Sequence, residues 1–355
     1  MLTLDVPLSA ELDRDWRFVA ALPSGGMVVQ AALAEQLLLL DRELRVSATL
    51  RWPELPSDSE VAVCERTGRV ALHAETALEV FELSGRRIHR LEHGDLTPAA
   101  PCAWSADGAL LWTIVPGAEP EAVHVVVIET ATWTVVGRRR LAADCRTYTS
   151  SFVVLADPVE PVAALQAVLC NLDGVHTAYL RLADGQLSPI FGSDEPDEDD
   201  ESADEELLAD VRPSGGEFLT VDIGERAVGV VGFRPLDQAR WLEWSELAGP
   251  KPTGSGLAEV DEGRWDGNGV GYLDDDFLIT QTADSQVLVL RREPLQLVAQ
   301  VDLEGYDFEP FTGWDIYRPG ASSRRRPLSW FAVCGPGRIV TSDNRIYDIG
   351  VHLHR

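Results

Sequence analysis

The chain has 355 residues, and 58 acidic side chains against 30 basic ones give it a formal net charge of −28. Such a charge repels nucleic acids and anionic lipid surfaces, so we expect neither a nucleic-acid partner nor a membrane partner. The hydrophobic fraction of 45% is enough for a large core and excludes disorder for the bulk of the chain.

The sequence shows neither a targeting or membrane-spanning segment nor a cysteine motif, and this bears on the compartment and on the state of the thiols. The segment Met1–Pro7 lacks the basic and apolar regions of a secretory signal, and no run of 18 or more apolar residues occurs. The five cysteines are widely spaced without a CxxC pair, a pattern typical of neither a disulfide framework nor a zinc site. We expect a cytoplasmic monomer without cofactors, in which strand cysteines such as Cys64 and Cys170 are small core residues.

Short apolar runs separated by turns follow one another along the chain, and helical periodicity is almost absent. Runs of the first two units begin at Phe18, Met27, Leu37 and Leu44, then at Val61, Val70, Leu78 and Ile88. The third unit is the clearest, because Asp107-Gly108 predicts a tight turn between two apolar runs. Each of these units therefore contains four predicted strands.

Similar units continue to the end of the chain, and their first strands begin near residues 17, 60, 102, 150, 208, 269 and 330. A repeat of about 40 to 50 residues with four strands is typical of propeller blades, and the wider later spacing indicates insertions. A two-sheet sandwich also has short strands and turns, but the regular count of four favours the propeller. We predict an all-β fold over residues 1–355: a single closed β-propeller of about seven four-stranded blades.

The third unit also resembles a known family. Its segment Trp104-Ser-Ala-Asp-Gly108, with Glu129-Thr-Ala-Thr132 before the last strand, resembles blades of WD-repeat and YVTN-type propellers. The paired Gly-His and Trp-Asp dipeptides of strict WD repeats are missing from every unit. The resemblance implies the architecture and no particular function, because propellers include binding proteins and enzymes alike.

A ring of blades must close, since an open edge strand invites aggregation. The last unit shows three clear strands, and the alternating residues Leu2–Val6 precede the first unit. We predict that residues 1–8 supply the outer strand of the last blade. The alternative is that the segment 351–354 supplies it.

Three long connections join outermost strands to the next innermost ones, at 192–207, 247–268 and 304–328. In a propeller such connections lie on one face, and long loops on rigid scaffolds often carry function. The segment 194–206 holds ten acidic residues and no basic one, which indicates a disordered, solvated linker. Docking to a basic partner, or loose binding of divalent cations, is the alternative for it.

The third of these connections combines aromatic and arginine residues, a combination typical of binding hot spots. The candidate partner-binding residues are Phe308, Phe311, Trp314, Tyr317, Arg324, Arg325 and Arg326, together with Trp265 of the second connection. The alternative is that the aromatic residues hold a long loop against the disc.

Local catalytic motifs are absent from the sequence. His352 and His354 would share one face of a strand and could bind a metal, but a frayed terminus is favoured. Asp274–Asp276 is predicted to be a hairpin turn. We therefore expect a non-catalytic interaction scaffold that presents one loop-rich face to a protein partner. The alternative is a hydrolase or lyase with a carboxylate or metal site in the axial channel.

Overall fold

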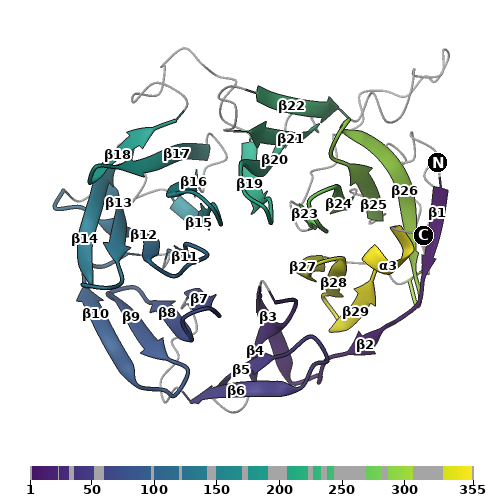
Figure 1. Cartoon of the computed structure of the whole chain (residues 1–355), viewed down its shortest axis with the longest axis horizontal. Coiled ribbons are helices and arrows are strands. Elements are labelled where there is room, and N and C mark those ends of the chain that lie inside the picture. The colour runs from purple at the N-terminus through teal and green to yellow at the C-terminus, as the bar shows by residue number, and fades with distance from the viewer. Residues whose placement is uncertain are drawn as a thin grey trace.

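Seven β-sheets surround a central axis in the computed structural model, as Figure 1 shows. The structure describes residues 2–22, 24–31, 36–51, 60–96, 100–119, 122–141, 149–169, 175–190, 206–222, 227–232, 238–243, 269–281, 287–306 and 331–353. Each sheet has its first strand innermost and later strands progressively further out, so each is one blade. This arrangement confirms the predicted seven-bladed β-propeller.

The first three blades follow the predicted units closely. Their strands are β3 (Trp16–Ala21), β4 (Met27–Ala31), β5 (Gln36–Leu40) and β6 (Val46–Arg51); β7 (Glu60–Cys64), β8 (Arg69–His73), β9 (Ala77–Glu82) and β10 (Arg87–Glu92); and β11 (Cys102–Trp104), β12 (Leu110–Pro116), β13 (Val123–Glu129) and β14 (Thr134–Arg140).

The next blades carry the wider spacing. The fourth and fifth consist of β15 (Thr149–Ala156), β16 (Val162–Leu169), β17 (Val175–Ala183) and β18 (Gln186–Pro189), then β19 (Glu206–Val211), β20 (Glu217–Asp222), β21 (Ala227–Gly232) and β22 (Gln238–Glu243). The sixth and seventh contain β23 (Val270–Tyr272), β24 (Phe277–Gln281), β25 (Val287–Arg291) and β26 (Gln296–Leu303), then β27 (Phe331–Gly335), β28 (Arg338–Thr341) and β29 (Arg345–Asp348).

Two predicted turns are confirmed in atomic detail. Asp107 accepts the backbone N–H of Ala109 at 2.9 Å, and Gly108 follows at φ +71° between β11 and β12. A Cβ at Gly108 would lie 2.6 Å from Thr67 of the preceding blade, so this close approach requires glycine. Asp274 likewise accepts the N–H groups of Asp276 and Phe277 between β23 and β24.

The apolar core is divided among the junctions between blades, with one buried cluster at each neighbouring pair. The largest fully buried side chain, Trp112, lies in the cluster between the third and fourth blades. Cys64, Cys102 and Cys334 are buried free thiols, as expected for core cysteines, while Cys170 lies outside the described residues. Each blade is thus stabilised mainly by its two neighbours.

The N-terminal segment closes the ring, but not with the predicted residues. β1 (Leu2–Val6) pairs in parallel with β26 and becomes a fifth strand of the sixth blade. The outer strand of the seventh blade is β2 (Ala10–Glu11), which pairs antiparallel with β29. The strap formed by residues 2–11 therefore crosses from one blade to the next (Figure 1).

The C-terminal alternative is wrong. The segment Gly350–Leu353 forms the short helix α3 instead of a strand, so His352 does not lie on a strand face. His354 lies outside the described residues. The backbone N–H of Gly350 donates to the carbonyl of Gly337 at 2.9 Å, and a Cβ at Gly337 would lie 2.8 Å from the Cα of Gly350. This close approach holds the chain that follows β29 against the turn between β27 and β28.

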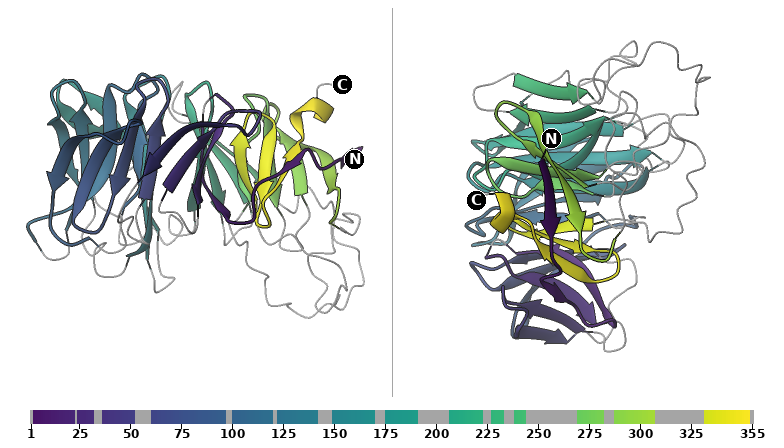
Figure 2. Two further views of the ribbon diagram at one scale, coloured as in Figure 1. Left: turned by 90° about the horizontal axis from the view of Figure 1, so that it is seen from below. Right: turned by 90° about the vertical axis from the view of Figure 1, so that its right-hand side faces the viewer.

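The disc has two unlike faces (Figure 2). Connections between second and third strands, and those from an outermost strand to the next innermost one, leave from one face, which we call the loop-rich face. The strand ends that flank 191–205, 244–268 and 307–330 lie on this face, although those segments are outside the described residues. The tight first hairpins of the blades, and α3, lie on the opposite face.

Candidate functional site

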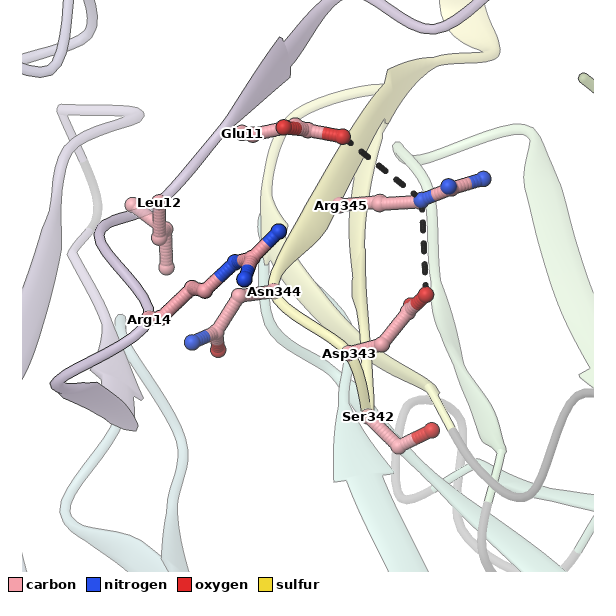
Figure 3. A pocket seen from close by; sticks show the side chains of 7 residues that line it. All are labelled: Glu11, Leu12, Arg14, Ser342, Asp343, Asn344 and Arg345. Carbon is pink, nitrogen blue, oxygen red and sulfur yellow. Dashed lines mark ion pairs between the residues drawn. The ribbon is translucent and has the colours of Figure 1, made fainter. Parts of the chain in front are cut away.

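A pocket opens on the loop-rich face where the last blade meets the first. Its cavity of about 520 Å³ is lined by Glu11, Leu12, Arg14, Ser342, Asp343, Asn344 and Arg345. We call it the seam pocket. Figure 3 shows that these side chains come from two segments at opposite ends of the chain, so the site exists only when the ring is closed.

Hydrogen bonds from Asn344 hold the two walls of the seam pocket together. Asn344 adopts the left-handed conformation at φ 66° in the turn between β28 and β29, which asparagine tolerates better than most residues. Its side-chain N–H groups donate to the carbonyls of Asp13 at 3.1 Å and Trp16 at 2.8 Å. The backbone N–H of Leu12 donates to the carbonyl of Asn344 at 2.8 Å.

Arg345 forms ion pairs with two acidic groups of the seam pocket. Its Nε lies 3.3 Å from Asp343 Oδ2 and 3.7 Å from Glu11 Oε1, and these ion pairs are drawn in Figure 3. The guanidinium also lies over the ring of Tyr306, 5.7 Å from its centroid. One arginine shared by two carboxylates leaves this group of three side chains with an excess of negative charge.

Tyr306 ties the pocket wall to the end of the sixth blade. Its hydroxyl donates to Asp343 Oδ1, and its ring packs at 6.2 Å from that of Tyr347. Burial, and next the hydrogen bond to Asp343, raise the pKa of the Tyr306 hydroxyl, so it stays protonated and donating at neutral pH. This residue immediately precedes the segment 307–330.

Arg14 contributes a second guanidinium to the pocket. The residue is exposed, and no described residue forms an ion pair with it. In the view of Figure 3 its guanidinium lies between the side chains of Glu11 and Asn344. Arg14 is therefore the charged group of the pocket that can respond most readily to a ligand.

A second set of polar residues forms a ring inside the disc. In each blade, the second strand carries a side-chain amide, hydroxyl or imidazole at its fourth or fifth residue. These residues are Gln30, His73, Thr113, Gln166, Thr220, Thr280 and Thr341. All except Gln30 are buried. Some of them link blades, as where Gln166 accepts the backbone N–H of Leu208 on the innermost strand of the next blade at 3.0 Å.

His73 joins the second and third blades through a chain of hydrogen bonds. His93 Nδ1 lies 2.7 Å from the carbonyl of Gly94, which can only accept, so Nδ1 carries the proton. His93 Nε2 must then accept from His73 Nε2 at 2.8 Å, and His73 Nδ1 accepts from the Thr113 hydroxyl at 3.0 Å. Burial, and next the charge of His93, lower the pKa of His73 to about 3.

A partly buried carboxyl group lies on an inner strand, where the channel hypothesis would place a carboxylate. Asp210 on β19 accepts the backbone N–H groups of Tyr272 at 2.7 Å and Val211 at 2.8 Å. The bond to Tyr272 links the fifth blade to the sixth, so this carboxyl group has a structural role. Desolvation there raises its pKa to about 6. Among the described residues, no group of three His, Cys, Asp or Glu side chains could hold a metal ion.

The residues predicted to bind a partner cannot be placed in this site. Phe308, Phe311, Trp314, Tyr317, Arg324, Arg325, Arg326 and Trp265 all lie outside the described residues. Sequence reasoning missed the seam pocket, because Glu11 and Arg345 meet only through ring closure. The available signal was Asp343-Asn344, a turn-forming pair between two predicted strands.

Comparisons with known proteins bear on the fold. No family model matches the chain, and no curated protein matches its sequence. Hydrazine synthase of Kuenenia stuttgartiensis is similar in structure, with a TM-score of 0.54 and 12% identity over 95% of this chain and 97% of that one. The β-propeller domain of Cps50 (Swd1) from Myceliophteria thermophila has a TM-score of 0.51 and 9% identity over 96% and 98%.

These likenesses show a β-propeller. At such identities they carry the fold alone, and one neighbour named as an enzyme stands beside one named only as a propeller domain. Within the described part of the chain, no helix is long and apolar enough to cross a membrane.

Proposed function

We propose that this chain is a non-catalytic interaction module that presents its loop-rich face to a protein partner. The observation that supports this most directly is the seam pocket, a polar cavity of about 520 Å³ on that face. It adjoins Tyr306, the last described residue before the segment that holds Phe311 and Trp314. That segment is rich in aromatic and arginine residues, which are typical of protein-binding surfaces.

Rigidity of the disc supports the same proposal. Buried apolar clusters at every junction, together with links such as the Asn344 bonds, hold the blades in fixed positions. Loops on a rigid scaffold lose less freedom on binding than loops on a mobile one. The described residues include no group of three His, Cys, Asp or Glu side chains that could hold the metal ion of the alternative, a hydrolase or lyase centred on the axial channel.

The test compares two faces of the same molecule. Phe311→Ala with Trp314→Ala changes the segment 307–330, which begins and ends at strands on the loop-rich face, while Glu82→Ala with Arg86→Ala removes an exposed ion pair on the opposite face. Each variant is immobilised, partners are captured from the native host, and direct binding of a purified partner is measured by calorimetry. We expect the first variant to weaken binding at least about tenfold, because hot-spot aromatics contribute 2 kcal/mol or more. The second should bind as the wild type does.

A partner that binds both variants equally well, or is lost from both, would contradict the proposal. Hydrolase or lyase activity of the purified chain in the absence of any partner would favour the alternative.

A further inference from the structure

Acidic groups surround the seam pocket more densely than basic ones. Asp13 and Asp15 flank Arg14 on the connection from β2 to β3, and Glu304 at the end of β26 accepts the backbone N–H of Leu8 at 2.9 Å. Arg345 is already shared by the two lining carboxylates. A ligand that enters this region of a chain with net charge −28 therefore meets an excess of negative charge.

Two acceptors in the lining of the pocket are available to that ligand. The amide of Asn344 gives its N–H groups to two backbone carbonyls, which sets its orientation, and no described donor occupies its carbonyl oxygen. The side chain of Glu11 is 60% exposed and is held only by a contact of 3.7 Å. Carbonyl and carboxylate oxygens together accept from guanidinium or ammonium groups.

The pocket also shows how it accommodates a cation. Arg345 lies between two carboxylates and over an aromatic ring, the surroundings that an arginine prefers. Arg14 is exposed and has no described ion-pair partner, and in the view of Figure 3 its guanidinium lies between Glu11 and Asn344. It therefore lines the same cavity that a cation from outside would enter.

We infer that the seam pocket binds an arginine or lysine side chain of the protein partner, and that Arg14 competes with this side chain for Glu11 and Asn344. This inference rests on the proposed function and makes it more specific, because it assigns the partner a basic contact residue. It also predicts the direction in which two substitutions change the affinity for the partner. Removing the Glu11 charge weakens binding, whereas removing the Arg14 charge strengthens it.

The probe is a fluorescent Gly-Arg-Gly-Arg-Gly peptide, and its glutamate counterpart is measured in parallel. Binding is followed by fluorescence anisotropy at about 0.15 M salt, where charges more than about 8 Å apart are largely screened. We expect Glu11→Gln to weaken binding of the arginine peptide about threefold and Arg14→Gln to strengthen it by a similar factor. Both factors are typical of single exposed charge contacts.

Glu82→Gln and Arg86→Gln are the matched controls, because they change the net charge equally on the opposite face. Equal effects of Glu11→Gln and Glu82→Gln would show unspecific attraction to an acidic protein and overturn the inference. Tighter binding of the glutamate peptide, weakened by Arg14→Gln, would assign the pocket to a carboxylate and overturn it as well.

Two further measurements separate a loss of binding from a loss of structure. Thermal unfolding of Glu11→Gln shows whether loss of its contact to Arg345 loosens the seam, and Arg14→Gln tests the inference without touching that contact. If the peptide effects fail while the Phe311/Trp314 variant still loses its partner, the pocket inference is wrong and the proposed function stands. If the peptide effects hold and no face-dependent partner exists, the proposed function fails alone.

Discussion

His73 is the residue whose chemistry differs most from its equivalents in the other blades. The equivalent second-strand positions hold glutamine or threonine, as Gln30 and Gln166 do in the first and fourth blades. The imidazole is fully buried, and the pairing with His93 leaves it neutral. An ionisable group thus takes a place where neutral hydrogen-bonding groups serve elsewhere.

This difference predicts an acid-sensitive joint between the second and third blades. The pKa of His73 is about 3 in the folded chain, against 6.5 for an ordinary histidine, so below pH 6.5 the unfolded state binds the extra proton. Stability is therefore lost as the pH falls from 6.5 toward 3, by up to about 1.4 kcal/mol per pH unit. His73→Gln should reduce the loss between pH 6.5 and 4.5 by about 2 kcal/mol, measured by urea unfolding at each pH.

The control is His352→Gln, a substitution on helix α3 far from this joint in the ring. The free energy of unfolding of this variant should keep the wild-type pH dependence. An unchanged slope in His73→Gln would mean that the joint opens or hydrates before His73 is protonated.

At the level of elements, the strap of residues 2–11 stabilises the fold mainly through a few buried side chains. Leu4 and Val6 are 8% and 2% exposed and belong to the cluster between the sixth and seventh blades, whereas Leu2 is 59% exposed. The alternation of β1 thus places one face on the core, although no described strand pairs with its outer edge. The added strand covers the edge of β26, and only the short β2 covers that of β29.

Leu4→Ala and Val6→Ala should each lower the free energy of unfolding by about 2 kcal/mol, because each leaves a space among well-packed neighbours. Leu2→Ala is the matched substitution on the exposed face and should change it by less than about 0.5 kcal/mol. Urea unfolding followed by tryptophan fluorescence measures all three. Similar values for Leu2→Ala and Leu4→Ala would show that β1 detaches before the disc unfolds.

The strap also shows where sequence reasoning stopped. Blades were predictable because apolar runs and turn pairs such as Asp107-Gly108 are local features of about ten residues. The alternating segment Leu2–Val6 is correctly predicted to be a strand. Its predicted partner is wrong, because alternation of apolar residues does not identify the strand with which a segment pairs. Ala10–Glu11 is too short for any periodicity. The seam pocket was unpredictable for the same reason, since it depends on this pairing.

Considered as a whole, the molecule carries a charge that opposes its own compactness. A net charge of −28 on 355 residues produces repulsion across the disc, and dissolved salt screens it. Buried ion pairs such as Arg292–Glu217, at 3.2 Å, are screened far less.

We therefore expect the midpoint of thermal unfolding to rise by about 2 °C or more between 0.02 and 0.3 M sodium chloride, measured by calorimetry at pH 7.5. Potassium chloride should act equally, since screening depends on ionic strength. A fall in the midpoint with salt would mean that exposed ion pairs such as Arg86–Glu82 outweigh the repulsion.

The strap has a final consequence for how the protein is made. Translation proceeds from N-terminus to C-terminus, so residues 2–11 are made long before their partners β26 and β29. This segment must therefore remain unpaired while the first five blades are synthesised. Ring closure is a late event that joins segments far apart in the translation product, and the seam pocket forms with it. A chain that stops before β29 cannot bind a ligand there.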